Sequence, residues 1–312
     1  MTWRAIGMLL CAFALPARAQ DIEPRAYSNA PVGVSFAIAG FAHASGGYEA
    51  DPTLPLEDAN IDTDTAILAW AHVFDVRGRS GKLDVIVPYA DLSGSATFDG
   101  DPVSRDVTGL ADPRIRFSYN LYGAPALSPA EFAGWQQRTI VGTSAQLGLP
   151  LGQYDEDRLV NIGTNRAFLK LELGVSHVVG RWTFELAAPV TLFADNDDFF
   201  GGRTREQAAV YGLQGGVVLS LKRGMWLAAN GTWYAGGRTT VDGVAKDDRL
   251  DNSRFGLTFA MPVKSEGPPL RYRMSTPPPE LKRNSFHVRT PASLEQPSSS
   301  SSSWFEPLAF GL

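Results

Sequence analysis

The strongest constraint on this chain is a segment that alternates apolar and polar residues and recurs along the chain up to residue 263. In residues 114–121, Ile115, Phe117, Tyr119 and Leu121 alternate with polar residues. Since side chains of a strand point alternately to its two faces, one face is apolar and the other polar. We expect such strands at residues 32–44, 65–74, 82–92, 113–122, 139–149, 167–178, 182–193, 209–221, 225–235 and 252–263.

Alternation alone also fits a soluble β-sandwich, which remains the alternative. Here, however, the apolar faces carry large residues along nearly their whole length, whereas the opposite faces mix small and charged residues. That combination is typical of a barrel with lipid outside and a polar lumen inside. The sequence therefore predicts an all-β, transmembrane, antiparallel up-and-down β-barrel with about ten visible strands.

The connections between the expected strands alternate in length, as in outer-membrane barrels with long external loops and short periplasmic turns. The longer connections are 45–64, 93–112, 150–166, 194–208 and 236–251, and the shorter ones are 75–81, 179–181 and 222–224. An even number of strands returns the chain to the periplasm. The strand at 65–74 is apolar on both faces, so the pattern does not orient it.

The connection 123–138 is the exception, because it is long where a short turn is expected. Ser128, Pro129 and Glu131 give an N-cap, a first-turn proline and a capping-box glutamate in the correct order. This order predicts a short periplasmic helix that runs through Phe132 and Trp135.

The N-terminus has the features of a secretory signal peptide. Arg4 precedes a short apolar core, and Ala17-Arg18-Ala19 matches the small-x-small cleavage pattern. We expect cleavage after Ala19, which makes residues 1–19 a signal peptide and removes Cys11, the single cysteine. The mature protein would then have no disulfide, thiol nucleophile or zinc-thiolate site.

Residues 20–263 contain 20 Lys and Arg against 29 Asp and Glu, a net charge of −9. An acidic body argues against nucleic-acid binding, which requires a concentrated basic surface. The connection 45–64 is acidic, and the short turns are basic. These charges are typical of a solvated surface. The alternative is that acidic loops bind lipopolysaccharide through bridging divalent cations.

Several stretches together resemble the outer-membrane proteins grouped as the putative MetA pathway of phenol degradation, often described as transporters. The resemblance covers residues 20–263 and implies a transmembrane barrel in the outer membrane that passes small aromatic or otherwise apolar solutes. The stretches that carry it are Glu23-Pro24-Arg25-Ala26-Tyr27, Gly78-Arg79-Ser80, Val87-Pro88-Tyr89, Asp112-Pro113-Arg114, Asn120-Leu121 with Gly123, Pro150-Leu151-Gly152-Gln153-Tyr154, Gly163-Thr164-Asn165-Arg166, Asn196-Asp197-Asp198-Phe199-Phe200 and Gly236-Gly237-Arg238-Thr239-Thr240.

The sequence departs from this family after Val263. The resemblance implies twelve strands, but residues 264–312 are rich in proline and serine, including the run Ser298–Ser303. Such a composition cannot bury a core, and proline removes donors from a β-ladder. We therefore expect an irregular, disordered tail in place of the last two strands. Its origin is either a reading-frame change in the gene or a natural extension.

Candidate catalytic and metal sites are weak. The mature histidines are not next to a Gly-x-Ser-x-Gly motif and do not have metal-ligand spacing. Residues 195–198 offer several oxygen ligands, but they lack the glycine and the terminal glutamate of a calcium loop. We predict no catalytic residue, no metal and no cofactor, with a Ser-His-Asn lipase on a barrel as the remaining alternative.

The expected lumen is the better candidate site. Polar side chains of the alternating strands are predicted to line it, and we further expect Glu172 and Glu185 to pair with Arg114 and Arg116 in a charged constriction. The predicted lining residues are Asp84, Arg114, Arg116, Asn120, Lys170, Glu172, Glu185 and Arg254.

Two functions follow from this interpretation. The first is an outer-membrane protein that passively transports small solutes, surrounded by lipid and lipopolysaccharide. The second is a structural or surface-interaction barrel whose lumen is plugged. The sequence identifies neither the solute nor the oligomeric state.

Overall fold

The computed structural model describes residues 25–47, 56–98, 100–222 and 225–260. The predicted signal peptide at residues 1–19 and the tail at 264–312 lie outside these described residues. The main antiparallel sheet has eleven described strands, ten of them in the order β1-β2-β3-β5-β6-β7-β8-β11-β12-β15, and the eleventh, β4, pairs with β3. The path of ten follows chain order, as an up-and-down barrel requires, while β14-β13-β10-β9 form a second sheet of four strands.

The ten strands of this path agree with the predicted positions to within a few residues at most ends. Their bounds are β1 Ser35–Gly47, β2 Leu56–Val76, β3 Arg79–Phe98, β5 Arg114–Tyr122, β6 Thr139–Gly148, β7 Phe168–Val179, β8 Trp182–Phe193, β11 Val210–Ser220, β12 Trp226–Gly236 and β15 Leu250–Ala260. Within the described residues, β1 pairs only with β2 and β15 only with β12.

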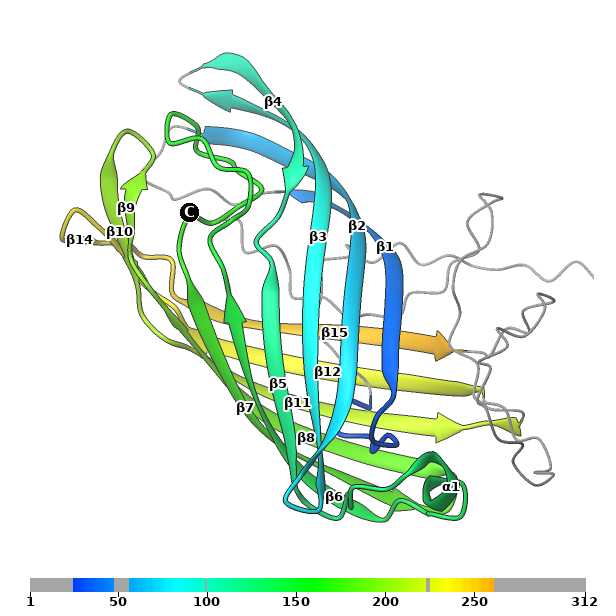
Figure 1. Cartoon of the computed structure of the whole chain (residues 1–312). Coiled ribbons are helices and arrows are strands. Elements are labelled where there is room, and N and C mark those ends of the chain that lie inside the picture. Colours follow the sequence, from blue (N-terminus) through cyan, green and yellow to red (C-terminus); the bar gives the residue numbers. More distant parts are fainter. Residues whose placement is uncertain (1–24, 48–55, 99, 223–224, 261–312) are drawn as a thin grey trace, which may run out of the picture.

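The sheet curls around a central space, with α1 and the short turns at one end (Figure 1). The opposite end, here called the mouth, carries the hairpins β9–β10 and β13–β14 and the far half of β3 with β4. The bounds of these elements are β4 Asp101–Leu110, α1 Pro129–Phe132, β9 Asn196–Phe199, β10 Arg203–Gln207, β13 Thr239–Val241 and β14 Val244–Ala245.

The predictions of long loops at residues 45–64 and 93–112 are wrong. Strands β2 and β3 are 21 and 20 residues long and extend well into these segments. Strand β5 pairs with the first part of β3, and β4 pairs with the last part, from Tyr89 to Phe98. In these extensions polar residues such as Asp62 and Thr63 replace the apolar alternation. Backbone hydrogen bonds pair the strands there, and scattered apolar residues such as Ile61 and Val107 pack against a cluster around Leu92, so no regular apolar alternation could reveal the extensions.

The helix α1 is shorter than predicted. Its capping box is present: the Ser128 backbone N–H donates to Glu131 Oε2 at 2.9 Å, and Ser128 Oγ accepts from the Glu131 backbone N–H. Hydrogen bonding to Ser128 lowers the pKa of the Glu131 carboxyl. The helix ends at Phe132, however, and Trp135 lies beyond it, with its ring stacked on that of Phe132 at 5.6 Å.

The two faces of the sheet differ sharply in exposure. Large apolar side chains are exposed on the outer face of every strand of the path for which side chains are described, among them Phe41, Leu68, Phe117, Leu173 and Leu257. The structure also orients β2, which the sequence left undecided: Leu68 and Trp70 point outward, and Ile67, Ala71 and Val73 are buried on the inner face. The outer face of the curled sheet is therefore an apolar band, whereas the inner face carries buried polar and charged residues together with smaller apolar ones.

Candidate functional site

The structure places the predicted lining residues on the inner face. Asp84, Arg114 and Arg116 are buried there, while their neighbours along the strands, such as Val87 and Phe117, are exposed outside. The remaining ones have the inward parity of their strands and are partly buried: Asn120, Lys170, Glu172, Glu185 and Arg254. Asn120 donates from Nδ2 to Ser80 Oγ at 2.8 Å, and the Arg254 guanidinium lies over the Tyr234 ring.

A row of polar residues crosses four neighbouring strands on this inner face. The strand registers place Asp84 opposite Arg116, Arg116 opposite Gln146, and Gln146 opposite Lys170. Arg116 Nε donates to Asp84 Oδ2 at 3.0 Å, and Lys82 Nζ lies 3.4 Å from the same oxygen. Arg116 thus has a carboxylate partner on an adjacent strand, Asp84, which the sequence pattern did not identify as its partner.

The two glutamates that were expected to pair with Arg114 and Arg116 contact the N-terminal segment. This segment, residues 25–34, precedes β1. The Arg25 backbone N–H donates to Glu185 Oε2 at 2.8 Å, and the Tyr27 hydroxyl donates to Glu172 Oε1. Lys170 Nζ lies 3.9 Å from the other Glu172 oxygen. Glu172 and Glu185 therefore hold residues 25–34 in the lumen.

Two glycines make room for this segment. Gly142 on β6 and Gly174 on β7 are opposite each other in register, and a Cβ on either would overlap the Tyr27 ring. Tyr27 is buried in an apolar cluster with Ala124, Ile140 and Ala187. The same segment joins the wall through its backbone, since Gly33 N–H donates to the Val73 carbonyl at 2.8 Å. Residues 25–34 thus form a packed plug inside the lumen, next to the end that carries α1.

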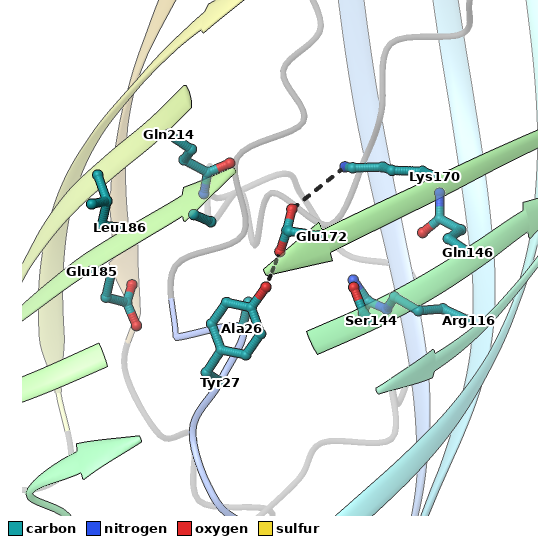
Figure 2. Close-up of a pocket in the computed structure, with 11 residues that line it drawn as sticks. Ala26, Tyr27, Arg116, Ser144, Gln146, Lys170, Glu172, Glu185, Leu186 and Gln214 are labelled. Atoms are coloured by element: carbon teal, nitrogen blue, oxygen red, sulfur yellow. Dashed lines mark hydrogen bonds and ion pairs between the residues drawn. The ribbon is translucent and has the colours of Figure 1, made fainter. Parts of the chain in front are cut away.

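A cavity that is partly open to solvent lies beside this plug. Figure 2 shows Tyr27 at its centre, Arg116, Gln146 and Lys170 on one side, and Glu185 and Gln214 on the other. The complete lining is Ala26, Tyr27, Arg116, Ser144, Gln146, Lys170, Glu172, Glu185, Leu186, Ala187 and Gln214. Cationic and carboxylate groups thus face one small space from different walls.

A lid covers the mouth of the barrel. Residues 149–167, which connect β6 to β7 and are here called the lid, pack Ile162 against Ala90, Leu92 and Ala111 in a second apolar cluster. Asp112 anchors both ends of the lid, since Oδ1 accepts from the Gly152 backbone N–H at 2.9 Å and Oδ2 from the Thr164 backbone N–H at 2.8 Å. The lid is therefore an ordered part of the barrel rather than a free loop.

Polar contacts tie the lid to the hairpin β9–β10. Asn196 Nδ2 donates to the Tyr154 hydroxyl at 2.9 Å, and Arg166 donates to Gln207 on β10. The Arg166 guanidinium lies over the Phe193 ring at 4.7 Å. Burial, together with the positive charge of Arg205, lowers the pKa of Arg166 to about 9, which leaves it protonated at neutral pH. Stretches that carry the family resemblance, around residues 112, 152, 164 and 196, thus meet at the mouth.

Sequence reasoning missed Tyr27, Gln146 and Asp112 as parts of the site. The N-terminal segment does not alternate, so nothing in its pattern indicated that it enters the lumen. Gln146 has the inward parity of a predicted strand and could have been found, but it carries no charge to draw attention. Asp112 stands just before β5 and was noticed only as part of a resembling stretch.

Sites of other kinds are not found in the described parts of the chain. Within residues 25–47, 56–98, 100–222 and 225–260, no group of three or more His, Cys, Asp or Glu side chains could hold a metal ion. In the same residues, no helix has the length and apolar character needed to cross a membrane.

Comparisons with known proteins agree with this architecture. The crystal structure of an outer membrane channel from Pseudomonas putida F1 matches with a TM-score of 0.61 at 24% sequence identity, covering 76% of this chain and 85% of that one. None of the curated proteins matches the chain. The family model described as "Putative MetA-pathway of phenol degradation" matches residues 42–266, most of the barrel. The chain therefore belongs to this family, as its resembling stretches predicted.

Proposed function

We propose that this protein is an outer-membrane channel that lets small solutes diffuse passively, and that it is not an enzyme. The apolar outer band carries this proposal. Soluble monomers rarely expose contiguous apolar patches larger than a few hundred Å², whereas a lipid-facing barrel requires such a surface. The similar fold of the Pseudomonas putida protein, an outer membrane channel, supports the same assignment.

The proposed setting follows from this band. Lipid and lipopolysaccharide surround the barrel, and a cleaved N-terminal signal peptide exports the chain. The lid end faces outward and the short turns with α1 face the periplasm, as the loop lengths of outer-membrane barrels favour. The solutes are small, because an inner wall of ten strands leaves little more space than one filled by side chains. We include solutes with aromatic or other apolar parts, in accordance with the family.

A plugged barrel without transport is the second candidate. The observation that favours it is the packed plug, in which Tyr27 is buried between Gly142 and Gly174. In that case, the lid and the plug would have a structural role, and the exposed loops would contact lipid or partner molecules.

Fractionation and conductance together test both candidates. We expect the protein in outer membranes after extraction with carbonate or urea, and recovery in the soluble periplasm would contradict the membrane assignment. In planar bilayers we expect single-channel currents, which increase or change ion selectivity when Arg114→Ala and Arg116→Ala remove charge from the inner wall. If normally inserted protein gave no current in either form, the plugged barrel would be favoured.

A further inference from the structure

The row Arg116–Gln146–Lys170 brings three hydrogen-bond donors together on one wall of the cavity. The residues lie directly opposite one another on β5, β6 and β7, and all three line the cavity beside Tyr27 (Figure 2). Guanidinium, amide and ammonium groups are the side chains that proteins use to bind carboxylates. Two of them are charged and the third, Gln146, lies between them.

Gln146 supplies an independent sign of a ligand. Its side chain is 5% exposed, and Nε2 has no hydrogen-bond partner among the described residues. A buried amide donor without an acceptor is destabilising, and natural proteins rarely leave one unless a ligand or water completes it. Since the Gln146 side chain is part of the cavity lining, an acceptor bound there that reaches this amide would satisfy it.

The charge of the wall favours an anion as that acceptor. The inner faces of β3, β5 and β7 carry four basic side chains, Lys82, Arg114, Arg116 and Lys170, against the carboxylates of Asp84 and Glu172. Glu185, the other carboxylate of the cavity lining, stands on β8 on the opposite side and accepts from the Arg25 backbone N–H. Asp84 and Glu172 each neutralise part of this charge, since Asp84 contacts Arg116 and Lys82 and Glu172 contacts Lys170, which leaves the wall with two more basic than acidic side chains. A cation would meet this net positive wall, whereas an anion is attracted to it.

We propose that this cavity binds small organic carboxylates, with the carboxylate at the row Arg116–Gln146–Lys170 and the apolar body beside Tyr27, Ala26 and Ala187. The proposal rests on the proposed function, because it names the class of solute that the channel selects. The cavity is partly open to solvent, so a solute can reach it. The apolar side chains beside it suit the body of such a solute, and the row suits its head group.

The test compares benzoate with benzamide, a neutral molecule of nearly the same shape. Full-length protein in detergent is titrated with each compound by calorimetry. We expect benzoate to bind at least about tenfold more tightly than benzamide, which is the effect of one or two hydrogen bonds to a charged group. Gln146→Leu and Lys170→Met should each weaken benzoate binding about tenfold and leave benzamide unchanged.

Lys222→Met serves as the matched control, because Lys222 is exposed beyond β11, outside the cavity. Equal binding of benzoate and benzamide, or no binding of benzoate to folded protein, would overturn the proposal. If a variant fails to fold, the comparison of benzoate with benzamide on the parent protein still tests whether the cavity prefers a carboxylate. Conductance without benzoate binding contradicts this site but not the channel, and benzoate binding without conductance contradicts the channel but not the site.

Discussion

Tyr27 is the residue on which the state of the lumen depends. Its ring fills the space that Gly142 and Gly174 leave open, and its hydroxyl engages Glu172. A side chain placed at either glycine would compete with the ring for the same volume. The two glycines therefore act as a socket, and the fit of Tyr27 in this socket determines whether the plug stays in the lumen.

We expect Gly174→Ala to displace Tyr27 and loosen the plug. Overpacking of this kind costs about 1–3 kcal/mol, and the displaced ring should increase single-channel conductance. Gly215→Ala is the control, because a Cβ there meets no atom within 4 Å. In a Tyr27→Ala background, Gly174→Ala should have no further effect on conductance. An additional increase in that background would show that Gly174 acts on something other than Tyr27.

At the scale of residues, the sequence predicted the face of the strand on which a side chain lies better than the residue that it contacts. Period-two alternation was sufficient to place Arg116, Glu172 and Glu185 on the inner face, because strand geometry fixes where each side chain points. It could not identify their partners, since these depend on the register between strands and on where the N-terminal segment lies. For that reason Asp84 was predicted as a lining residue but not as the partner of Arg116.

At the scale of elements, Asp112 anchors the lid to the mouth of the barrel. Asp112 stands just before β5 and accepts three hydrogen bonds from the lid, one from Gly152 and two from Thr164. It therefore holds the two ends of the lid together at the mouth. Arg158 is exposed within the lid and gives a convenient cleavage site for trypsin.

Asp112→Ala should release the lid. Hydrogen bonds to a buried carboxylate contribute about 1.5–3 kcal/mol each, so we expect faster cleavage by trypsin at Arg158 and larger currents. Limited proteolysis of protein in lipid vesicles measures the first effect, and planar bilayers measure the second. Asp101→Ala, at an exposed position on β4, should change neither. If cleavage at Arg158 kept its parent rate in Asp112→Ala, another contact would be holding the lid.

The observed strand boundaries show which parts of the strands apolar alternation can predict. Membrane-spanning segments were predicted well, because lipid on one face imposes a strict apolar alternation. Beyond the apolar band this constraint ends, and strands such as the far half of β3 continue through backbone pairing with β4 and through contacts of Leu92 in the apolar cluster at the mouth. The lid was predicted as a long connection, but its inward packing through Ile162 depends on contacts with distant strands.

At the scale of the whole molecule, the barrel is a polar interior wrapped in an apolar surface. Ten strands contribute to this surface in chain order, so each adds one column of outward side chains. The energetic cost of a charge on the surface should then depend on its depth in the bilayer rather than on local packing. This dependence distinguishes a lipid-facing band from an interface with another protein.

Leu173→Arg therefore tests the architecture directly. Leu173 lies near the middle of β7 and is 54% exposed on the outer face, so an arginine there would lie near the bilayer midplane. We expect the free energy of unfolding in lipid to fall by about 2–4 kcal/mol, whereas Tyr122→Arg at the end of β5 should cost only about 0–1 kcal/mol because it lies near the interface. Urea titration in phospholipid bilayers measures both. Equal costs at the two positions would mean that the band does not face lipid, since only a bilayer makes the same arginine more costly at the centre than at the edge.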